Sequence, residues 1–314
     1  MKKTTLIRLL AAAILVWTLA AETPALTENA GEPFTWWGVE ITANQTEVTF
    51  EDTDWLVPSE LDTLIAQRPN LKTINMFNKK LKLKELPEIF EKYPDIEFGL
   101  TIELNKSHVI RTDMTAYSTL GRQPQVSKAQ TKYFTYLRHL QALDIGHMNI
   151  YSAEFLENMP KLKILIIADC ALRDIEALRG QTELEYLEVF KNYISDLTPL
   201  SGMTKLKDLN LGYCEITDLS PIYDLPSLER VWLMGNWYLS EEEIERFRQH
   251  QPNCEIVTRS YGATGNLMDE KMVQTPGTSW RHHPHYDTIY WIFHHNEYIG
   301  WDVEVPQVKT AADP

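Results

Sequence analysis

Leucine and other aliphatic residues recur at a fixed spacing between residues 140 and 238. The pattern Leu-x-x-Leu-x-Ile, with aliphatic replacements, occurs five times, and each copy starts 22 residues after the previous one. The copies start at Leu140, Leu162, Leu184, Leu206 and Leu228. Apolar residues spaced two apart predict a short strand with one buried face. Because 22 residues cannot bury that face alone, we expect the copies to stack in parallel.

One further position follows each predicted strand in register, and it holds a polar or sulfur-containing side chain in every copy. Its members are Met148, Cys170, Asn192, Cys214 and Asn236. We expect the amides and thiols to face inward and bind backbone groups of the adjacent coil. On the opposite side, Pro199 and Pro221 disfavour a regular helix and predict extended or 3₁₀ turns. The Asp residues that open these turns share one repeat position, which indicates turn residues rather than an acid–base pair: Asp174, Asp196 and Asp218.

This register resembles the short, 22-residue class of bacterial leucine-rich repeat found in internalin-like surface proteins. The resemblance implies an α/β solenoid with a curved parallel sheet on its concave side. Turns, 3₁₀ helices and short helices would form the convex side, with helical caps at both ends. The segment Arg111-Thr112-Asp113 and the sequence Trp280-Arg281-x-x-Pro284-x-Tyr286 also look like exported leucine-rich repeat proteins of Firmicutes. The resemblance brings no catalytic activity.

We place the five repeats at residues 133–239, and the rest of the chain forms separate segments before and after them. A basic start and a short apolar run ending in small residues predict a secretory signal peptide at 1–21, with an uncleaved membrane anchor as the alternative. The other predicted segments are a linker at 22–35, an N-terminal cap with divergent repeats at 36–132, and a C-terminal cap with a His- and aromatic-rich tail at 240–314. Residues 103–132 form an irregular insert within the N-terminal cap.

Local signals predict individual elements in both caps. We expect one strand at 36–41 and others at 47–50, 69–76, 94–98 and 252–257. A capping-box pattern starting at Ser59 predicts a helix to residue 68, and Ser240 marks the start of another. Further helices are expected at 86–92, from about 133 and at 287–293.

Charge and cysteine content limit the possible partners and disulfides of this chain. The chain carries 30 Lys plus Arg against 44 Asp plus Glu, a formal charge of −14. This acidity argues against nucleic acid and anionic membranes as partners. Cys170 and Cys214 lie two coils apart, about 10 Å at the usual strand spacing, so we predict no disulfide between them. Cys254 is expected to be buried.

Outward-facing strand residues would line the concave face, where polar side chains are usual. Several residues toward the C-terminal half are instead large and apolar, and aromatics with Met and Arg typify protein-binding surfaces. The predicted ligand-binding residues are Tyr186, Glu188, Phe190, Asp208, Asn210, Tyr213, Arg230, Trp232 and Met234. The alternative is that the C-terminal tail or a loop covers this apolar patch.

Candidates for catalysis are few. Five of the nine His lie between His282 and His295, which raises the alternative of a metal-dependent hydrolase centred on the tail. Their spacing matches no established metal motif, and the sequence contains no G-x-S-x-G and no phosphate-binding loop. We therefore predict an exported, secreted or cell-surface, non-catalytic binding protein without a cofactor or metal. Its concave face would hold a protein or peptide, with carbohydrate as another possible ligand.

Overall fold

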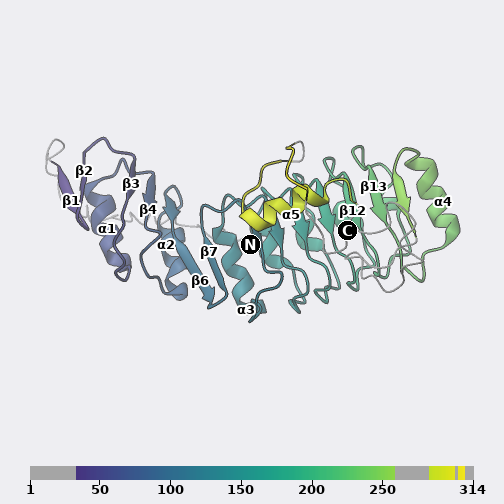
Figure 1. Cartoon of the computed structure of the whole chain (residues 1–314), viewed down its shortest axis with the longest axis horizontal. Coiled ribbons are helices and arrows are strands. Elements are labelled where there is room, and N and C mark those ends of the chain that lie inside the picture. Colours follow the sequence, from purple (N-terminus) through teal and green to yellow (C-terminus); the bar gives the residue numbers. More distant parts are fainter. Residues whose placement is uncertain (1–32, 259–282, 301–302, 308–314) are drawn as a thin grey trace, which may run out of the picture.

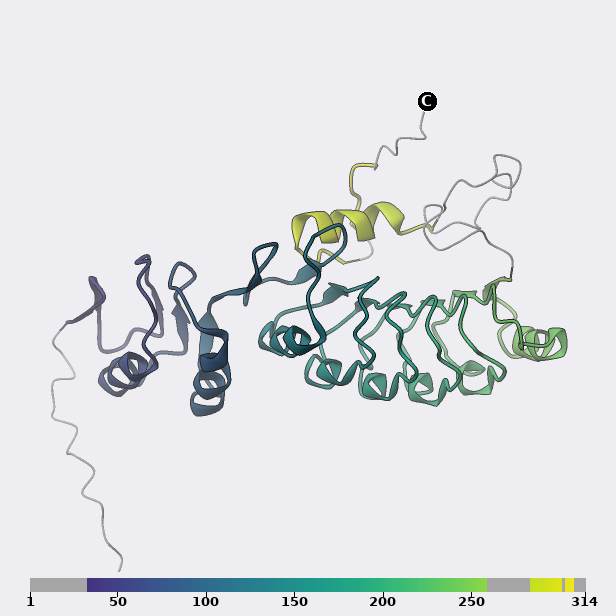
Figure 2. The same ribbon diagram turned by 90° about the horizontal axis from the view of Figure 1, so that it is seen from below.

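The chain forms an elongated solenoid in which strands line one side and helices or 3₁₀ turns line the other (Figures 1 and 2). This computed structural model describes residues 33–258, 283–300 and 303–307. The predicted signal peptide at 1–21 and most of the linker at 22–35 lie outside the described residues. Within the described part, the structure contains no helix with the length and apolar character needed to cross a membrane.

A parallel sheet, here called the main sheet, runs through the repeats and has seven strands in the described part of the chain. Its strands are β8 (Ala116–Ser118), β9 (Ala142–Asp144), β10 (Ile164–Ile166), β11 (Tyr186–Glu188), β12 (Asp208–Asn210), β13 (Arg230–Trp232) and β14 (Glu255–Val257). Neighbouring strands pair without a slip, so that Ile164 lies opposite Tyr186 and Tyr186 opposite Asp208. The predicted 22-residue register and parallel stacking are therefore confirmed.

The inward polar position works as predicted. The Asn192 amide nitrogen donates to the carbonyls of Ile167 and Val189, both at 2.9 Å. Its oxygen accepts from the backbone N–H of Cys170 at 3.1 Å and of Leu172 at 3.0 Å. One buried side chain thus satisfies four backbone groups in two coils, which locks each coil to the next.

The side opposite the main sheet carries the predicted turns as 3₁₀ helices. They are η3 (Glu154–Asn158), η4 (Glu176–Leu178), η5 (Thr198–Leu200) and η6 (Ser220–Ile222). The repeated Asp residues open the turns, since Asp196 Oδ1 accepts from Thr198 N–H at 2.8 Å and Asp218 Oδ1 from Ser220 N–H at 2.9 Å. Their assignment as turn residues is confirmed.

The N-terminal region differs from the prediction in two places. Residues 36–41 belong not to one strand but to a hairpin, because Trp37 and Gly38 both have positive φ and turn the chain between β1 (Phe34–Trp36) and β2 (Val39–Ile41). Helix α1 (Pro58–Gln67) begins before Ser59, since Pro58 fixes the first helical φ, and no side chain caps it.

A second, smaller parallel sheet follows in the N-terminal region. It consists of β3 (Glu47–Thr49), β4 (Thr73–Asn75) and β5 (Glu97–Gly99). The helical elements η1 (Leu83–Glu85) and α2 (Leu86–Lys92) pack behind it, and α2 has the bounds that the sequence predicts.

The irregular insert is largely ordered structure. An antiparallel hairpin, β6 (Thr101–Asn105) and β7 (His108–Arg111), separates the small sheet from the main sheet. The chain then adds β8 to the main sheet and continues into α3 (Lys128–Thr131) and η2 (Lys132–Tyr136). Although the hairpin interrupts the strands, the apolar core runs continuously from Ile41 to Phe247.

Two helices follow the repeats. Helix α4 (Glu241–His250) starts at Ser240, whose hydroxyl oxygen accepts from Glu243 N–H at 3.1 Å, as the sequence predicts. Helix α5 (Tyr286–His295) does not extend the solenoid. It lies across the strands of the main sheet, on the side away from the turns (Figures 1 and 2).

Candidate functional site

The outward side of the main sheet, here called the strand face, corresponds to the predicted concave surface. Exposure was expected there, but six of the nine predicted ligand-binding residues are buried: Tyr186, Glu188, Asp208, Asn210, Trp232 and Met234. Phe190 and Arg230 are partly buried, and Tyr213 is exposed. The expectation of an open strand face is therefore wrong for most of these side chains in this conformation.

Helix α5 covers part of the strand face, including Tyr186, whereas Trp232 and Met234 pack with Val257 in a separate cluster. The α5 residues Ile289 and Ile292, three apart on one side of the helix, are completely buried. They pack into one apolar cluster with strand-face residues of β8 to β11 and the loop after β10: Ala116, Ala142, Ile164, Ile166, Ala168 and Tyr186. The tail thus covers the part of the apolar patch around Tyr186 and Phe190, as in the alternative of intramolecular cover.

A histidine anchors the start of the α5 segment. The His283 side chain is buried, and its Nε2 lies 2.8 Å from Asp208 Oδ1. The imidazole stacks on Trp232 with ring centroids 5.5 Å apart, and Tyr186 meets it edge-on, also at 5.5 Å. Arg230 Nη1 lies 3.0 Å from the same Asp208 oxygen. The predicted residues Tyr186, Asp208, Arg230 and Trp232 therefore do converge, but they hold a residue of this chain.

The other end of the segment is tied to the first strand of the main sheet. The Asn296 carbonyl accepts from Ala116 N–H at 3.3 Å, and Thr115 Oγ1 accepts from Tyr298 N–H at 2.8 Å. The Lys163 ammonium lies 5.0 Å from the centre of the Tyr298 ring. Contacts at His283, in the middle of α5 and at Tyr298 therefore distribute the attachment over most of the main sheet.

Two buried carboxyl groups besides Asp208 lie on the strand face, and both have raised pKa values. Burial raises the pKa of Glu188 to about 7, and the Tyr186 hydroxyl donates to Glu188 Oε2 at 2.9 Å. Burial also raises the pKa of Asp144, whose oxygens accept from Ser118 Oγ at 2.7 Å and Gly146 N–H at 3.0 Å. Desolvation of an unpaired carboxylate causes both changes.

One edge of the solenoid, by contrast, exposes aromatic side chains. They lie on the loops that leave the C-terminal ends of β11, β12 and β13 and are here called the aromatic edge: Tyr193, Tyr213, Trp237 and Tyr238. Trp237 is 83% exposed and Tyr238 77% exposed. In the four preceding repeats the position equivalent to Tyr238 is buried and aliphatic, so the last repeat departs from the register at this point.

The described tail histidines form two pairs at opposite ends of α5, His283 with His285 and His294 with His295, rather than one cluster. His283 contacts Asp208, whereas His294 and His295 are exposed on α5 and stack on Tyr290 and Trp291. In the described ranges, no group of three His, Cys, Asp or Glu side chains is placed to hold a metal ion. His282 lies outside those ranges.

The three cysteines are free; Cys170 and Cys214 are buried, whereas Cys254, expected to be buried, is only partly so. The surroundings of Cys170 and Cys214 make them poor nucleophiles. Burial raises the pKa of Cys170 to about 12 and that of Cys214 to about 11. Their thiols point to backbone carbonyls, with Cys170 Sγ 3.2 Å from the Ile145 oxygen. Such thiols remain protonated at physiological pH and serve as small packing residues.

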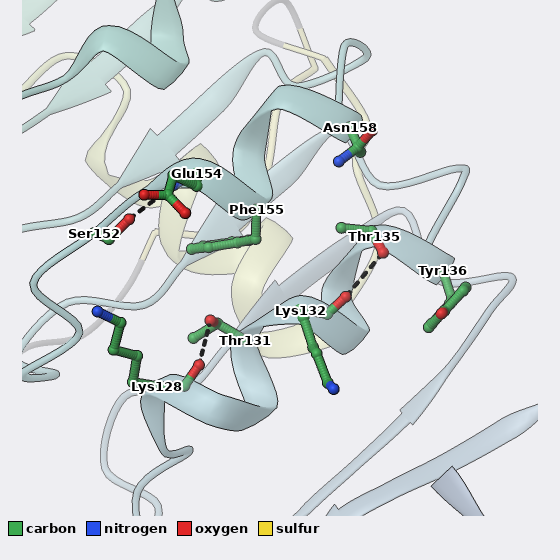
Figure 3. A pocket seen from close by; sticks show the side chains of 9 residues that line it. All are labelled: Lys128, Thr131, Lys132, Thr135, Tyr136, Ser152, Glu154, Phe155 and Asn158. Carbon is green, nitrogen blue, oxygen red and sulfur yellow. Dashed lines mark hydrogen bonds between the residues drawn. The ribbon is translucent and has the colours of Figure 1, made fainter. Parts of the chain in front are cut away.

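A cavity of about 410 Å³ lies on the turn side, between the α3–η2 segment and η3 (Figure 3). Its lining includes Lys128, Thr131 and Thr135, but the threonine hydroxyls donate to backbone carbonyls of their own helices at 2.8 Å. Ser152 Oγ likewise accepts from Glu154 N–H at 3.3 Å. These polar groups are already satisfied, and the cavity contains no convergent set of catalytic groups.

No family model and no curated protein matches the sequence. Solved structures that resemble it include three bacterial proteins. An internalin, InlF, from Listeria monocytogenes str. 4b F2365 is 19% identical over 61% of this chain and 48% of its own, with a TM-score of 0.38. Internalin C2 from the same strain is 23% identical over 61% of this chain and 72% of its own, with a TM-score of 0.37. A leucine-rich repeat protein of Leptospira interrogans is 17% identical over 60% of this chain and 55% of its own, with a TM-score of 0.31.

The described chain is thus a leucine-rich repeat solenoid, as its strand register and coil-to-coil hydrogen bonds establish. It spans about half the length of the first internalin. The helix predicted at 287–293 is confirmed as α5 (Tyr286–His295), and the Ile289–Ile292 spacing marks its buried side. The exposure of Trp237 was not predicted, although the equivalent positions Asn149, Tyr193 and Glu215 in other repeats are exposed as well.

Proposed function

We propose that this chain is an exported, non-catalytic protein-binding solenoid and that the aromatic edge is its partner-binding surface. The observation that carries the proposal is the exposure of Tyr193, Tyr213, Trp237 and Tyr238 along consecutive coils. Folding does not require such exposure. Exposed clusters of large apolar side chains are typical of interaction sites, and Trp and Tyr are the most frequent anchors of protein interfaces.

The backbone beneath the aromatic edge is held rigidly. Trp237 follows Asn236, whose amide nitrogen donates to the carbonyls of Leu211 at 2.9 Å and Leu233 at 3.0 Å. The oxygen of the same amide accepts from Ile216 N–H at 3.0 Å. Because the inward residue fixes the loop, the neighbouring aromatic residue loses little backbone freedom on binding, which favours affinity.

Side-chain packing supports part of the same surface. Phe190 and Tyr213 pack edge to face with ring centroids 5.3 Å apart. The Arg173 guanidinium lies 5.1 Å from the centre of the Tyr193 ring. The aromatic edge therefore combines ordered rings with a cation, a combination that suits a protein surface.

The test compares capture of extracellular proteins by the parent chain and by a Trp237→Ala/Tyr238→Ala variant. Trp55→Ala is the matched control, because Trp55 is also exposed, at 54%, but lies near the N-terminal sheet. We expect the parent and the control to retain a partner that the double variant loses, with all three proteins equally stable. Equal capture by all three would exclude the aromatic edge, and capture of no partner by the parent would argue against a protein-binding role.

A further inference from the structure

Helix α5 makes contacts of the kind seen between a peptide helix and its receptor groove. The main sheet is complete without it, since α5 neither pairs with a strand nor forms part of a coil. Its attachment includes one apolar stripe, one buried histidine and, just beyond its C-terminal end, one backbone–backbone and one backbone–side-chain hydrogen bond. Anchors one turn apart on an amphipathic helix characterise helix-in-groove recognition.

The strand face is shaped to receive a helix. Ala116, Ala142 and Ala168 are small, while Ile164, Ile166 and Tyr186 are large, and all of them meet α5 in one cluster. Small side chains allow the helix to approach the sheet, and large ones fill the space beside it. A strand face intended for water would carry polar groups at these positions.

The polar end of the site, at Asp208, determines the orientation in which a helix can bind. Asp208 is buried to 1% exposure and accepts both the His283 imidazole and the Arg230 guanidinium. A buried carboxylate is costly unless partners of this kind compensate it, so a residue that replaces His283 must also donate a hydrogen bond. The distance along the chain from His283 to Ile289 then fixes which way the helix lies.

We propose that the strand face is a receptor site for an amphipathic helix and that α5 occupies it as a resident, self-inhibiting ligand. The external ligand is a protein helix that presents two aliphatic residues three positions apart and an upstream hydrogen-bond donor. It binds by displacing α5. This site is separate from the aromatic edge, and the proposal does not rest on partner binding there.

The test uses the full chain carrying Ile289→Asp and Ile292→Asp, which frees the strand face without changing a repeat residue. The probe is a fluorescent synthetic peptide with the sequence of residues 283–300, and binding is followed by anisotropy. The control peptide carries the same two Asp substitutions. Loss of two buried isoleucines should weaken the control peptide roughly a hundredfold or more.

The parent chain should bind the same probe far more weakly than the variant, because its own α5 competes at an effective concentration on the order of millimolar. Circular dichroism and thermal unfolding establish that the variant is folded. A milder variant, His283→Ala, provides a second comparison and should bind the probe with intermediate strength. Absence of saturable binding to a folded Asp variant, or equal binding of the two peptides, would overturn the proposal.

Discussion

Replacing Glu188 with Gln should remove a pH dependence of stability. The Glu188 carboxyl is 5% exposed, and burial raises its pKa from an ordinary 4.5 to about 7. Below pH 4.5 the group is protonated in both the folded and the unfolded chain. As pH rises toward 7, the unfolded chain releases this proton while the folded chain retains it. The stability present in acid is therefore lost across this interval and is fully lost above about pH 7.

The interval from 4.5 to about 7 corresponds to roughly 3 kcal/mol of unfolding free energy, at about 1.4 kcal/mol per pH unit. Gln keeps the shape and the acceptor for the Tyr186 hydroxyl but does not titrate in this range. Between pH 4.5 and 8 the parent should therefore lose about 3 kcal/mol more stability than the variant. Asp144 contributes in the same direction, and because its charge also raises the pKa of Glu188, the difference includes this interaction between the two carboxyl groups.

Urea unfolding at pH 4.5, 6, 7 and 8 measures this difference directly. Glu215→Gln serves as the control, because Glu215 is an exposed carboxylate one coil away and should leave the pH profile of the parent unchanged. Parallel profiles for the parent and Glu188→Gln would refute the reasoning, since they would mean that the folded chain ionises Glu188 as readily as the unfolded chain.

Three further results are expected. Asn192→Ala should destabilise the fold by about 3 kcal/mol in urea unfolding, since it leaves buried backbone groups unpaired, while the exposed Asn149→Ala should be nearly neutral. Glu243→Ala should cost about 2 kcal/mol by thermal unfolding, because its carboxylate accepts from Leu219 N–H at 2.8 Å, and Glu242→Ala should cost little; equal effects would contradict this. A thiol reagent should label the native chain slowly and the urea-unfolded chain rapidly, since burial raises the pKa of Cys170, Cys214 and Cys254.

The repeats were predictable because their key side chains have structural roles within one coil or between adjacent coils. The period set the strand register, the inward Asn and Cys positions set the coil contacts, and the Asp residues set the turns. These roles recur every 22 residues, so the assignment of a residue in one copy can be compared with the equivalent residues in the other copies. Segments without copies were harder to predict. The hairpin β6–β7 does not follow the 22-residue repeat, and the Trp37–Gly38 turn was missed because a Trp with positive φ is unusual.

The sequence predicted which residues come together at the candidate site but not that a segment of the same chain covers them. The outward positions of Tyr186, Asp208 and Trp232 followed from strand alternation, and the structure does bring them together around one ligand group. That group is His283, which is 75 residues from Asp208 in the sequence. Strand periodicity contains no information about contacts at this distance, so the alternatives of external ligand and internal cover could not be separated.

The hairpin between β5 and β8 divides the solenoid into two stacks that share a core but not a hydrogen-bonded ladder. In stacked coils, cooperativity passes between nearest neighbours, and the weakest junction is where unfolding can halt. The stack from β1 to β5 carries Trp36, Trp37 and Trp55, whereas Trp232 and Trp237 lie in the other. Each stack therefore has its own fluorescent reporters, so tryptophan emission can follow the unfolding of the two stacks separately.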